Sequence, residues 1–193
     1  MVTASVYRAR AQRPPVDPEP EALHSYSSLQ VQVTGRPAEI ARKMADSIPD
    51  KDLGPEGRET EPHITCRWGL HFMTPSARLR ETLRSFGPIT ATLGKTSLFS
   101  NPDADVLKVD VESPDLHRLY KLIGRVVPVH TTHPTYKPHL TIAYLKPGKG
   151  KKYAGDASFV GQKMTFNAVT FSGKKGTREG IPLVSMAPVY RVR

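Results

Sequence analysis

Two short stretches of this 193-residue chain place a histidine and a threonine two positions apart, a spacing suited to acid and base chemistry. One runs Glu-Pro-His-Ile-Thr over residues 61–65, and the other runs Lys-Pro-His-Leu-Thr over residues 137–141. Side chains two positions apart on a β-strand point to the same face. Each stretch therefore predicts a strand that presents one pair, His63 with Thr65 or His139 with Thr141. We expect the two strands to meet across one cleft.

The other residues of these strands predict apolar faces that point away from the cleft. Alternation assigns six side chains to them, namely Ile64, Cys66, Trp68, Leu140, Ile142 and Tyr144. Cys66 is then a small buried hydrophobe rather than a nucleophile, and a single cysteine forms no internal disulfide.

Two further copies of the same three-letter pattern lie at residues 130–132 and 133–135. They sit in a connection rich in Thr and Pro that has no apolar period, which predicts a loop. The copies at residues 63–65 and 139–141 differ from these two. Each has a proline before the histidine, an aliphatic residue between His and Thr, and a strand-like apolar alternation after it.

A pair of imidazoles can supply both proton transfers that cleavage of a phosphodiester needs. With an ordinary pKa of about 6.5, one histidine can accept a proton from the attacking hydroxyl while the other donates one to the leaving oxygen. A threonine hydroxyl beside each ring can donate to a non-bridging phosphoryl oxygen. The alternative is that each His-Thr pair only satisfies buried backbone groups.

Composition is that of a globular protein, with 38% hydrophobic and 24% charged residues. The formal charge of +10 favours a phosphate-bearing partner, although it does not separate a long nucleic acid from a small nucleotide. No apolar run approaches a membrane span or the core of a signal peptide, so we expect a cytoplasmic protein without a membrane partner.

Other catalytic schemes find little support in the sequence. Neither strand places a carboxylate or a second histidine beside the first, so a hydrolytic zinc site would lack its usual third ligand. No Gly-x-Ser-x-Gly elbow and no phosphate loop ending in Gly-Lys-Ser or Gly-Lys-Thr is present. We therefore expect no metal and no cofactor.

Short helices and hairpins alternate along the chain, which predicts an α+β fold rather than a doubly wound parallel sheet. Residues 1–23 predict a flexible, Pro-rich arm. The expected helices start at Pro37, at Thr74-Pro75 and at Ser113-Pro114. The expected strands besides the two His-Thr strands span residues 26–33, 89–100, 106–112, 164–171 and 181–192, and residues 50–60 predict a surface loop.

Paired Pro-His-aliphatic-Thr strands, one in each half of a chain of this size, resemble the two-histidine (2H) phosphoesterase superfamily, which includes 2′-5′ RNA ligases and cyclic phosphodiesterases. The resemblance covers residues 24–193. It implies a single bilobal domain in which two antiparallel sheets with pseudo-twofold symmetry line a central cleft, with helices on the outside and no metal requirement. His63 and His139 would be the acid and base pair, and Thr65 and Thr141 the phosphate binders.

Within the superfamily, residues 61–71 and residues 137–153 look most like the phage anti-CBASS phosphodiesterases. That resemblance implies cleavage of the 3′-5′ bonds of cyclic di- and trinucleotide signals in the cytoplasm of a bacterial host, with no protein partner. Tyr26 would then stack on a base and Glu179 would hydrogen-bond to one. Local packing at a strand edge is the alternative for Tyr26.

Two other functions stay open at this point. One is a 2′,3′-cyclic phosphodiesterase or a ligase that acts on RNA ends, and the other is a protein that binds RNA or a nucleotide without turnover. The Lys- and Gly-rich residues 146–153 fit either a loop that folds over a bound phosphate or a solvated surface loop.

Overall fold

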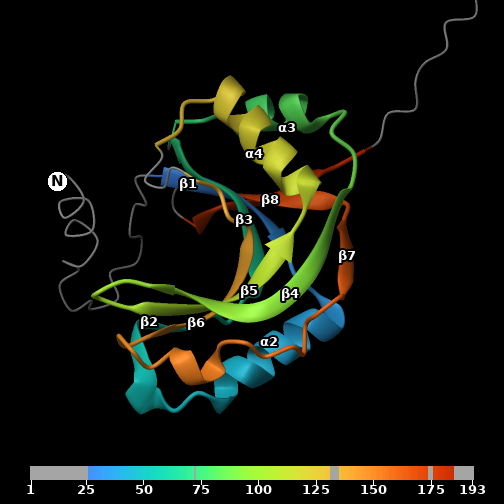
Figure 1. Cartoon of the computed structure of the whole chain (residues 1–193). Coiled ribbons are helices and arrows are strands. Elements are labelled where there is room, and N and C mark those ends of the chain that lie inside the picture. The colour runs from blue at the N-terminus through green and yellow to red at the C-terminus, as the bar shows by residue number, and fades with distance from the viewer. Residues whose placement is uncertain (1–25, 72, 131–134, 174–175, 185–193) are drawn as a thin grey trace, which may run out of the picture.

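The computed structural model describes residues 26–71, 73–130, 135–173 and 176–184 (Figure 1). Within them lie three α-helices, α2 (Gly35–Ser47), α3 (Ser76–Leu83) and α4 (Pro114–Val126), and two 3-10 turns, η1 (Asp50–Asp52) and η2 (Lys151–Tyr153). The strands are β1 (Tyr26–Gln32), β2 (Leu53–Arg58), β3 (His63–His71), β4 (Ile89–Ser100), β5 (Asp105–Glu112), β6 (His139–Leu145), β7 (Lys163–Phe166), β8 (Ala168–Ser172) and β9 (Arg178–Pro182). The predicted arm, residues 1–23, lies outside the described residues.

The strands of the described residues form one antiparallel sheet with the order β7-β4-β5-β6-β3-β1-β8-β9, and β2 pairs with β6 as an additional strand. The resemblance to the 2H superfamily implied two antiparallel sheets. One sheet forms instead because Ile64 of β3 and Leu140 of β6 make a single antiparallel pair that joins the two halves. On one side of that pair lie β2, β4, β5, β6 and β7, and on the other lie β1, β3, β8 and β9.

The sheet is strongly curled, as its connectivity requires (Figure 1). The predicted strand 164–171 is divided at Asn167 into β7, which pairs with β4, and β8, which pairs with β1. Consecutive Cα atoms are only about 3.8 Å apart. Since one residue separates strands that belong to opposite ends of the sheet order, those two ends must approach each other.

Apolar side chains from one face of this sheet pack against the helices. Alternating residues such as Val31, Ile64 and Leu140 are fully or almost fully buried there, together with the apolar stripe of each helix. In Figure 1, α2 lies below the curled sheet, whereas α3 and α4 lie above it. The helices therefore cover the apolar face and leave the opposite face for polar side chains. None of the helices in the described ranges is long and apolar enough to cross a membrane.

The predicted surface loop at residues 50–60 contains regular structure, so that prediction was wrong. It holds η1 and β2, and β2 pairs with β6 through Leu53 opposite Leu145 and Arg58 opposite Ala143. Glycines and Pro55 concealed this strand, because they are typical of turns but are tolerated on an irregular edge strand. The last predicted strand, 181–192, begins earlier, as β9 at Arg178, and residues 185–192 lie outside the described part.

We predict that Leu140→Ala lowers the free energy of unfolding by about 2–5 kcal/mol, because Leu140 is fully buried at the only described pair that joins the two half-sheets. Chemical denaturation measures the change. Val160→Ala, which shortens an exposed apolar side chain, is the control and should stay within about 0.5 kcal/mol of the wild type. A Leu140→Ala protein as stable as the control would contradict the importance of this junction.

Candidate active site

The pairing of β3 with β6 brings the two His-Thr stretches together. Because the strands are antiparallel and Ile64 lies opposite Leu140, His63 falls beside Thr141 and Thr65 falls beside His139. Ile64 and Leu140 are fully buried, so the four flanking side chains point to the other face, where each is half-buried. We call this side of the sheet the histidine face.

Both imidazoles are oriented by the same backbone contact. Nδ1 of His63 lies 2.8 Å from the Glu61 carbonyl oxygen, and Nδ1 of His139 lies 2.8 Å from the Lys137 carbonyl oxygen. A carbonyl oxygen only accepts hydrogen bonds, so in both rings Nδ1 carries the proton and donates it. Nε2 of each ring is then the atom that can take up or release a proton during a reaction.

Lys108 is a functional candidate that the sequence analysis did not single out. It lies opposite Thr141 on β5 and is only 5% exposed. Its ammonium group donates to Ser97 Oγ at 2.6 Å and to the Asp110 carboxylate, and it lies 4.3 Å from the centre of the Phe99 ring. The alternation of residues 106–112 places Lys108 and Asp110 on one face, but only the register with β6 identifies that face as the histidine face.

The pKa of His139 is lowered from its ordinary value, first by burial and further by the charges of Lys108 and His63. The Lys137 carbonyl and the Asp110 carboxylate oppose this shift. A lowered pKa keeps His139 neutral and ready to accept a proton at neutral pH. The influence of His63 on the pKa of His139 also shows that the two rings lie within electrostatic reach of each other.

His63 has different neighbours. The Glu59 carboxylate lies 3.9 Å from its Nδ1 atom, and the Glu61 carboxylate forms an ion pair with Arg178. His63 thus has a carboxylate nearby, whereas His139 has both the buried Lys108 cation and its ion-pair partner, the Asp110 carboxylate, nearby.

Two β-bulges turn Trp68 and Tyr144 toward the histidine face, which contradicts the predicted alternation. In β3, Thr65 lies opposite Gln30 of β1, and Arg67 lies opposite the adjacent residue Leu29. Cys66, between Thr65 and Arg67, therefore has no partner of its own in β1 and is an additional residue. In β6, Ile142 is additional in the same way, between Thr141 and Ala143. One additional residue reverses the faces of all that follow.

Cys66 and Ile142 themselves stay in the core, as predicted. Burial raises the pKa of the Cys66 thiol, which keeps it protonated and unreactive.

Tyr26 lies on the histidine face, as the sequence predicted, within a cluster of aromatic side chains. Its ring stacks on His130 with centroids 5.0 Å apart and lies 5.3 Å from the Trp68 ring. Gly69 allows His130 to approach, since its φ is +83° and a Cβ atom at this position would lie only 1.9 Å from the His130 carbonyl oxygen. The amide of His130 donates to the Gly69 carbonyl at 2.7 Å.

Glu179 does not lie on the histidine face. It pairs with Phe171 in the register that places Arg178 opposite Ser172, so Glu179 and Arg178 point to opposite faces of β9. Its carboxylate forms an ion pair with Arg80 of α3, on the helix side of the sheet. The predicted contact between Glu179 and a base on the histidine face is therefore contradicted by its position, and Arg178 is the residue of this pair that lies on that face.

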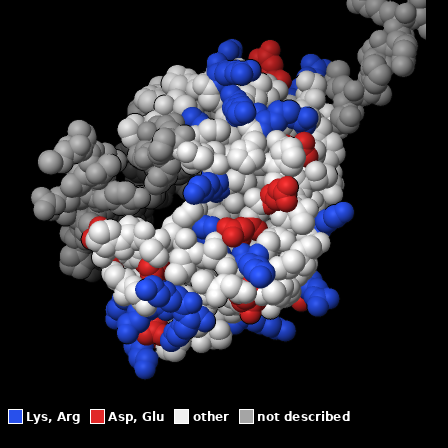
Figure 2. All heavy atoms as spheres, in the orientation of Figure 1, with Lys and Arg blue, Asp and Glu red and all other residues white. Residues whose placement is uncertain are grey.

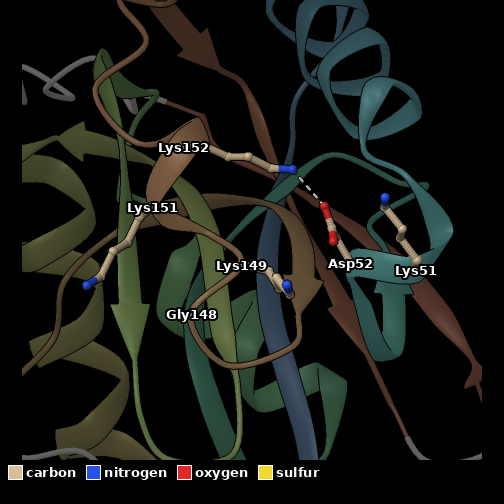
Figure 3. A pocket seen from close by; sticks show the side chains of 6 residues that line it. All are labelled: Lys51, Asp52, Gly148, Lys149, Lys151 and Lys152. Atoms are coloured by element: carbon tan, nitrogen blue, oxygen red, sulfur yellow. Dashed lines mark hydrogen bonds and ion pairs between the residues drawn. The ribbon is translucent and has the colours of Figure 1, made fainter.

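The basic loop after β6 lines a separate pocket of about 480 Å³ (Figure 3). Its lining residues are Lys51, Asp52, Gly148, Lys149, Lys151 and Lys152. The loop is fixed there, because Lys152 forms an ion pair with the buried Asp52 carboxylate at 2.8 Å and Lys146 donates to the Lys51 carbonyl at 2.9 Å. Figure 2 shows the cationic surface at this end of the molecule. The pocket lies at the end of β6 away from His139 and contains none of the His-Thr residues.

The described residues contain no group of three or more His, Cys, Asp or Glu side chains arranged to hold a metal ion. The groups that converge on the histidine face include two imidazoles, two hydroxyls and the buried ammonium group of Lys108 with its partner, the Asp110 carboxylate. This set can transfer protons and stabilise negative charge on oxygen.

We predict that Lys108→Met raises the pKa of His139, because it removes a positive charge that disfavours the imidazolium and leaves the Asp110 carboxylate, which favours it, without its partner. An NMR titration of the His139 ring signals measures the midpoint in each protein. Lys163→Met, which removes an exposed lysine on β7, is the matched control. A His139 midpoint that stays constant or falls in Lys108→Met would contradict this electrostatic assignment.

Comparison with known proteins identifies the family to which the chain belongs. A sequence profile of the 2′-5′ RNA ligase superfamily matches residues 37–158, which is more than half of the chain. No curated protein matches the sequence. Among solved structures, TT0787 of Thermus thermophilus is similar with a TM-score of 0.56 and 16% identity, over 82% of this chain and 97% of that one.

Two further structures are similar at lower scores. A phosphoesterase matches with a TM-score of 0.48 and 14% identity, over 83% of this chain and 96% of its own. Kluyveromyces marxianus Usb1 with uridine monophosphate matches with a TM-score of 0.46 and 12% identity, over 82% and 98%. The profile match spans both His-Thr strands, and the chain therefore belongs to the 2′-5′ RNA ligase superfamily of two-histidine phosphoesterases.

Proposed function

We propose that this protein is a phosphodiesterase in which His63 and His139 act on opposite sides of one phosphorus atom. The observation that carries the proposal is the register of β3 with β6, which sets each histidine beside the threonine of the other strand. The matching contacts of the two Nδ1 atoms support a pseudo-twofold relation between the two motifs. Membership of the superfamily supports phosphodiesterase chemistry.

In this mechanism His139 is the base and His63 the acid for the first step. Nε2 of His139 takes the proton of a ribose 2′-hydroxyl or a water, whose oxygen forms a bond to phosphorus. As the bond from phosphorus to the 5′-oxygen breaks, Nε2 of His63 gives its proton to that oxygen. The lowered pKa of His139 supports its role as base, and His63, with the Glu59 carboxylate 3.9 Å from its Nδ1 atom, is assigned the complementary role of acid.

The remaining groups stabilise the negative charge on the non-bridging phosphoryl oxygens. Thr65 and Thr141 donate hydrogen bonds from their hydroxyl groups to the non-bridging oxygens. Lys108 adds a positive charge beside Thr141, in a buried position where screening by water is weak. Because these groups supply both proton transfer and charge stabilisation, we propose that the reaction needs no metal ion.

We propose cyclic di- and trinucleotides as substrates, and evasion of bacterial antiphage signalling by a phage as the biological role. The two His-Thr stretches and their flanking residues carry the resemblance to that branch. The aromatic cluster of Tyr26, Trp68 and His130 on the histidine face offers a surface on which a base can stack. The net charge of +10 favours a substrate that carries phosphates.

An enzyme that acts on RNA ends is the second candidate, and the lysine pocket favours it. A cyclic dinucleotide held between the two histidines has no phosphate to place beyond the end of β6. A longer RNA strand could reach Lys149 and Lys151 with its backbone.

We predict that His63→Ala and His139→Ala each lower kcat/KM for the hydrolysed phosphodiester by about 100-fold to 10,000-fold, because each removes one of two proton transfers. Thr65→Ala and Thr141→Ala should each cost about 10-fold to 1,000-fold. His117→Ala, which changes an exposed histidine on α4, is the control and should keep wild-type activity. Steady-state kinetics measure these values. Full activity in either His63→Ala or His139→Ala would remove the site assignment.

We also predict that the purified protein, in excess chelator, hydrolyses cyclic di- and trinucleotides faster than RNA with a 2′,3′-cyclic end. Chromatographic separation of the products over time gives both rates. Faster processing of the RNA end would establish the second candidate instead. Binding without product from any substrate would indicate a non-catalytic protein, and activity lost on chelation would contradict a metal-free mechanism.

A further inference from the structure

The two halves of the histidine face carry an aromatic residue at the same distance from each catalytic histidine. Trp68 is five positions after His63, and Tyr144 is five positions after His139. In both strands the additional residue of the bulge is the third after the histidine, Cys66 or Ile142, and it turns the aromatic side chain toward the histidine face. Without these bulges, both rings would point into the apolar core.

Trp68 and Tyr144 lie on opposite sides of the Ile64–Leu140 pair. Since β3 and β6 are antiparallel, the chain leaves the Ile64–Leu140 pair toward Trp68 on one side and toward Tyr144 on the other. Each aromatic residue is four positions from that pair, which corresponds to about 13 Å along each strand. A phosphate held between the histidines therefore has one aromatic side chain on either side, at a distance suited to an attached nucleoside.

Apolar or aromatic side chains lie near both rings. Trp68 is 36% exposed and adjoins Tyr26. Tyr144 is half-buried and lies opposite Val106, which in turn lies opposite Phe99 of β4. Phe99 packs edge-on against the His139 ring with centroids 5.0 Å apart, so an apolar and aromatic surface continues from the catalytic histidine toward Tyr144.

We propose that Tyr144 is a second base-binding residue, the counterpart of Trp68, and that the site takes a phosphodiester with a nucleoside on each side of the reacting phosphate. This inference rests on the proposed function of the histidine face and narrows its substrate class to dinucleoside phosphates, linear or cyclic. An aromatic ring is worth about 1–3 kcal/mol per stacked base, whichever base it is. Two such rings favour an internal linkage over a nucleotide that carries a single base.

A pair of substrates that differ only in the second base tests this proposal. One is the dinucleotide UpU, and the other is uridine 3′-(methyl phosphate), which has the same reacting phosphate but a methyl group in place of the second nucleoside. In the wild type we expect a higher kcat/KM for UpU. Tyr144→Ala should lower the ratio of the two kcat/KM values by about 5-fold to 100-fold, as the loss of one stacked base predicts. Tyr144→Phe, which keeps the ring, should restore most of the ratio.

Val160→Ala, an exposed apolar residue away from this face, is the matched control and should leave the ratio at its wild-type value. The midpoint of thermal unfolding shows whether Tyr144→Ala remains folded, and Tyr144→Leu provides a second variant of similar bulk without an aromatic ring. An equal loss for both substrates, or no loss in either variant, would overturn the proposal while leaving the phosphodiesterase activity established.

Binding measurements test the two-base site independently of catalytic turnover. Trp68 is the only tryptophan of the chain, so its fluorescence reports directly on the first base. In the His63→Ala/His139→Ala protein, UpU should quench this fluorescence, and adding Tyr144→Ala should weaken UpU binding by about 5-fold to 100-fold. If UpU binds in this way but the wild type hydrolyses neither substrate, the proposed function fails and the two-base site stands. Equal UpU affinity with and without Tyr144→Ala would overturn the two-base site.

Discussion

The single antiparallel pair between Ile64 and Leu140 is the interaction on which the candidate site depends. It is the one described pair between the two halves of the sheet, and both of its side chains are fully buried. Because the pair is antiparallel, it brings each histidine next to the threonine of the other strand. A shift by one residue would turn one His-Thr pair toward the core, so apolar packing on one face fixes the chemistry of the other.

The two halves are alike in backbone but not in charge. Both histidines donate from Nδ1 to the carbonyl two residues earlier, so neither ring is distinguished by its orientation. Their neighbours differ, since the ion pair of Lys108 with Asp110 lies close to His139 and the Glu59 carboxylate lies beside His63. A repeated backbone thus holds its two histidines in different electrostatic surroundings, because the residues outside the repeated motif differ.

The bulges in β3 and β6 allow one strand to place apolar side chains in the core and an aromatic side chain on the histidine face. Up to Thr65 and Thr141, strict alternation places apolar residues in the core and reactive ones on the histidine face. One additional residue then reverses the faces, which allows an aromatic ring to follow on the reactive side. Bulges are known to redirect side chains near active sites. Here their equivalent positions in β3 and β6 make the two sides of the site comparable.

The sequence by itself determined the α+β class, the helices, most strands and the common face of each His-Thr pair, because these follow from local periodicity and from motifs within a few residues. It placed Tyr26 on the correct face for the same reason, since β1 alternates without an additional residue up to its end. Local sequence patterns did not predict how strands distant along the chain pair with one another. Which strands joined the halves, and that they formed one curled sheet, depended on long-range contacts.

Only the tertiary structure decided the faces of Trp68, Tyr144 and Glu179 and the position of Lys108 on the histidine face. A bulge leaves no mark in the pattern of apolar residues, because it is defined by a partner strand that the local sequence does not contain. The ion pair of Glu179 with Arg80 joins residues about one hundred positions apart, and the cation of Lys108 matters only because β5 lies beside β6. Local sequence specifies which side chains alternate, whereas the register between strands specifies what they face.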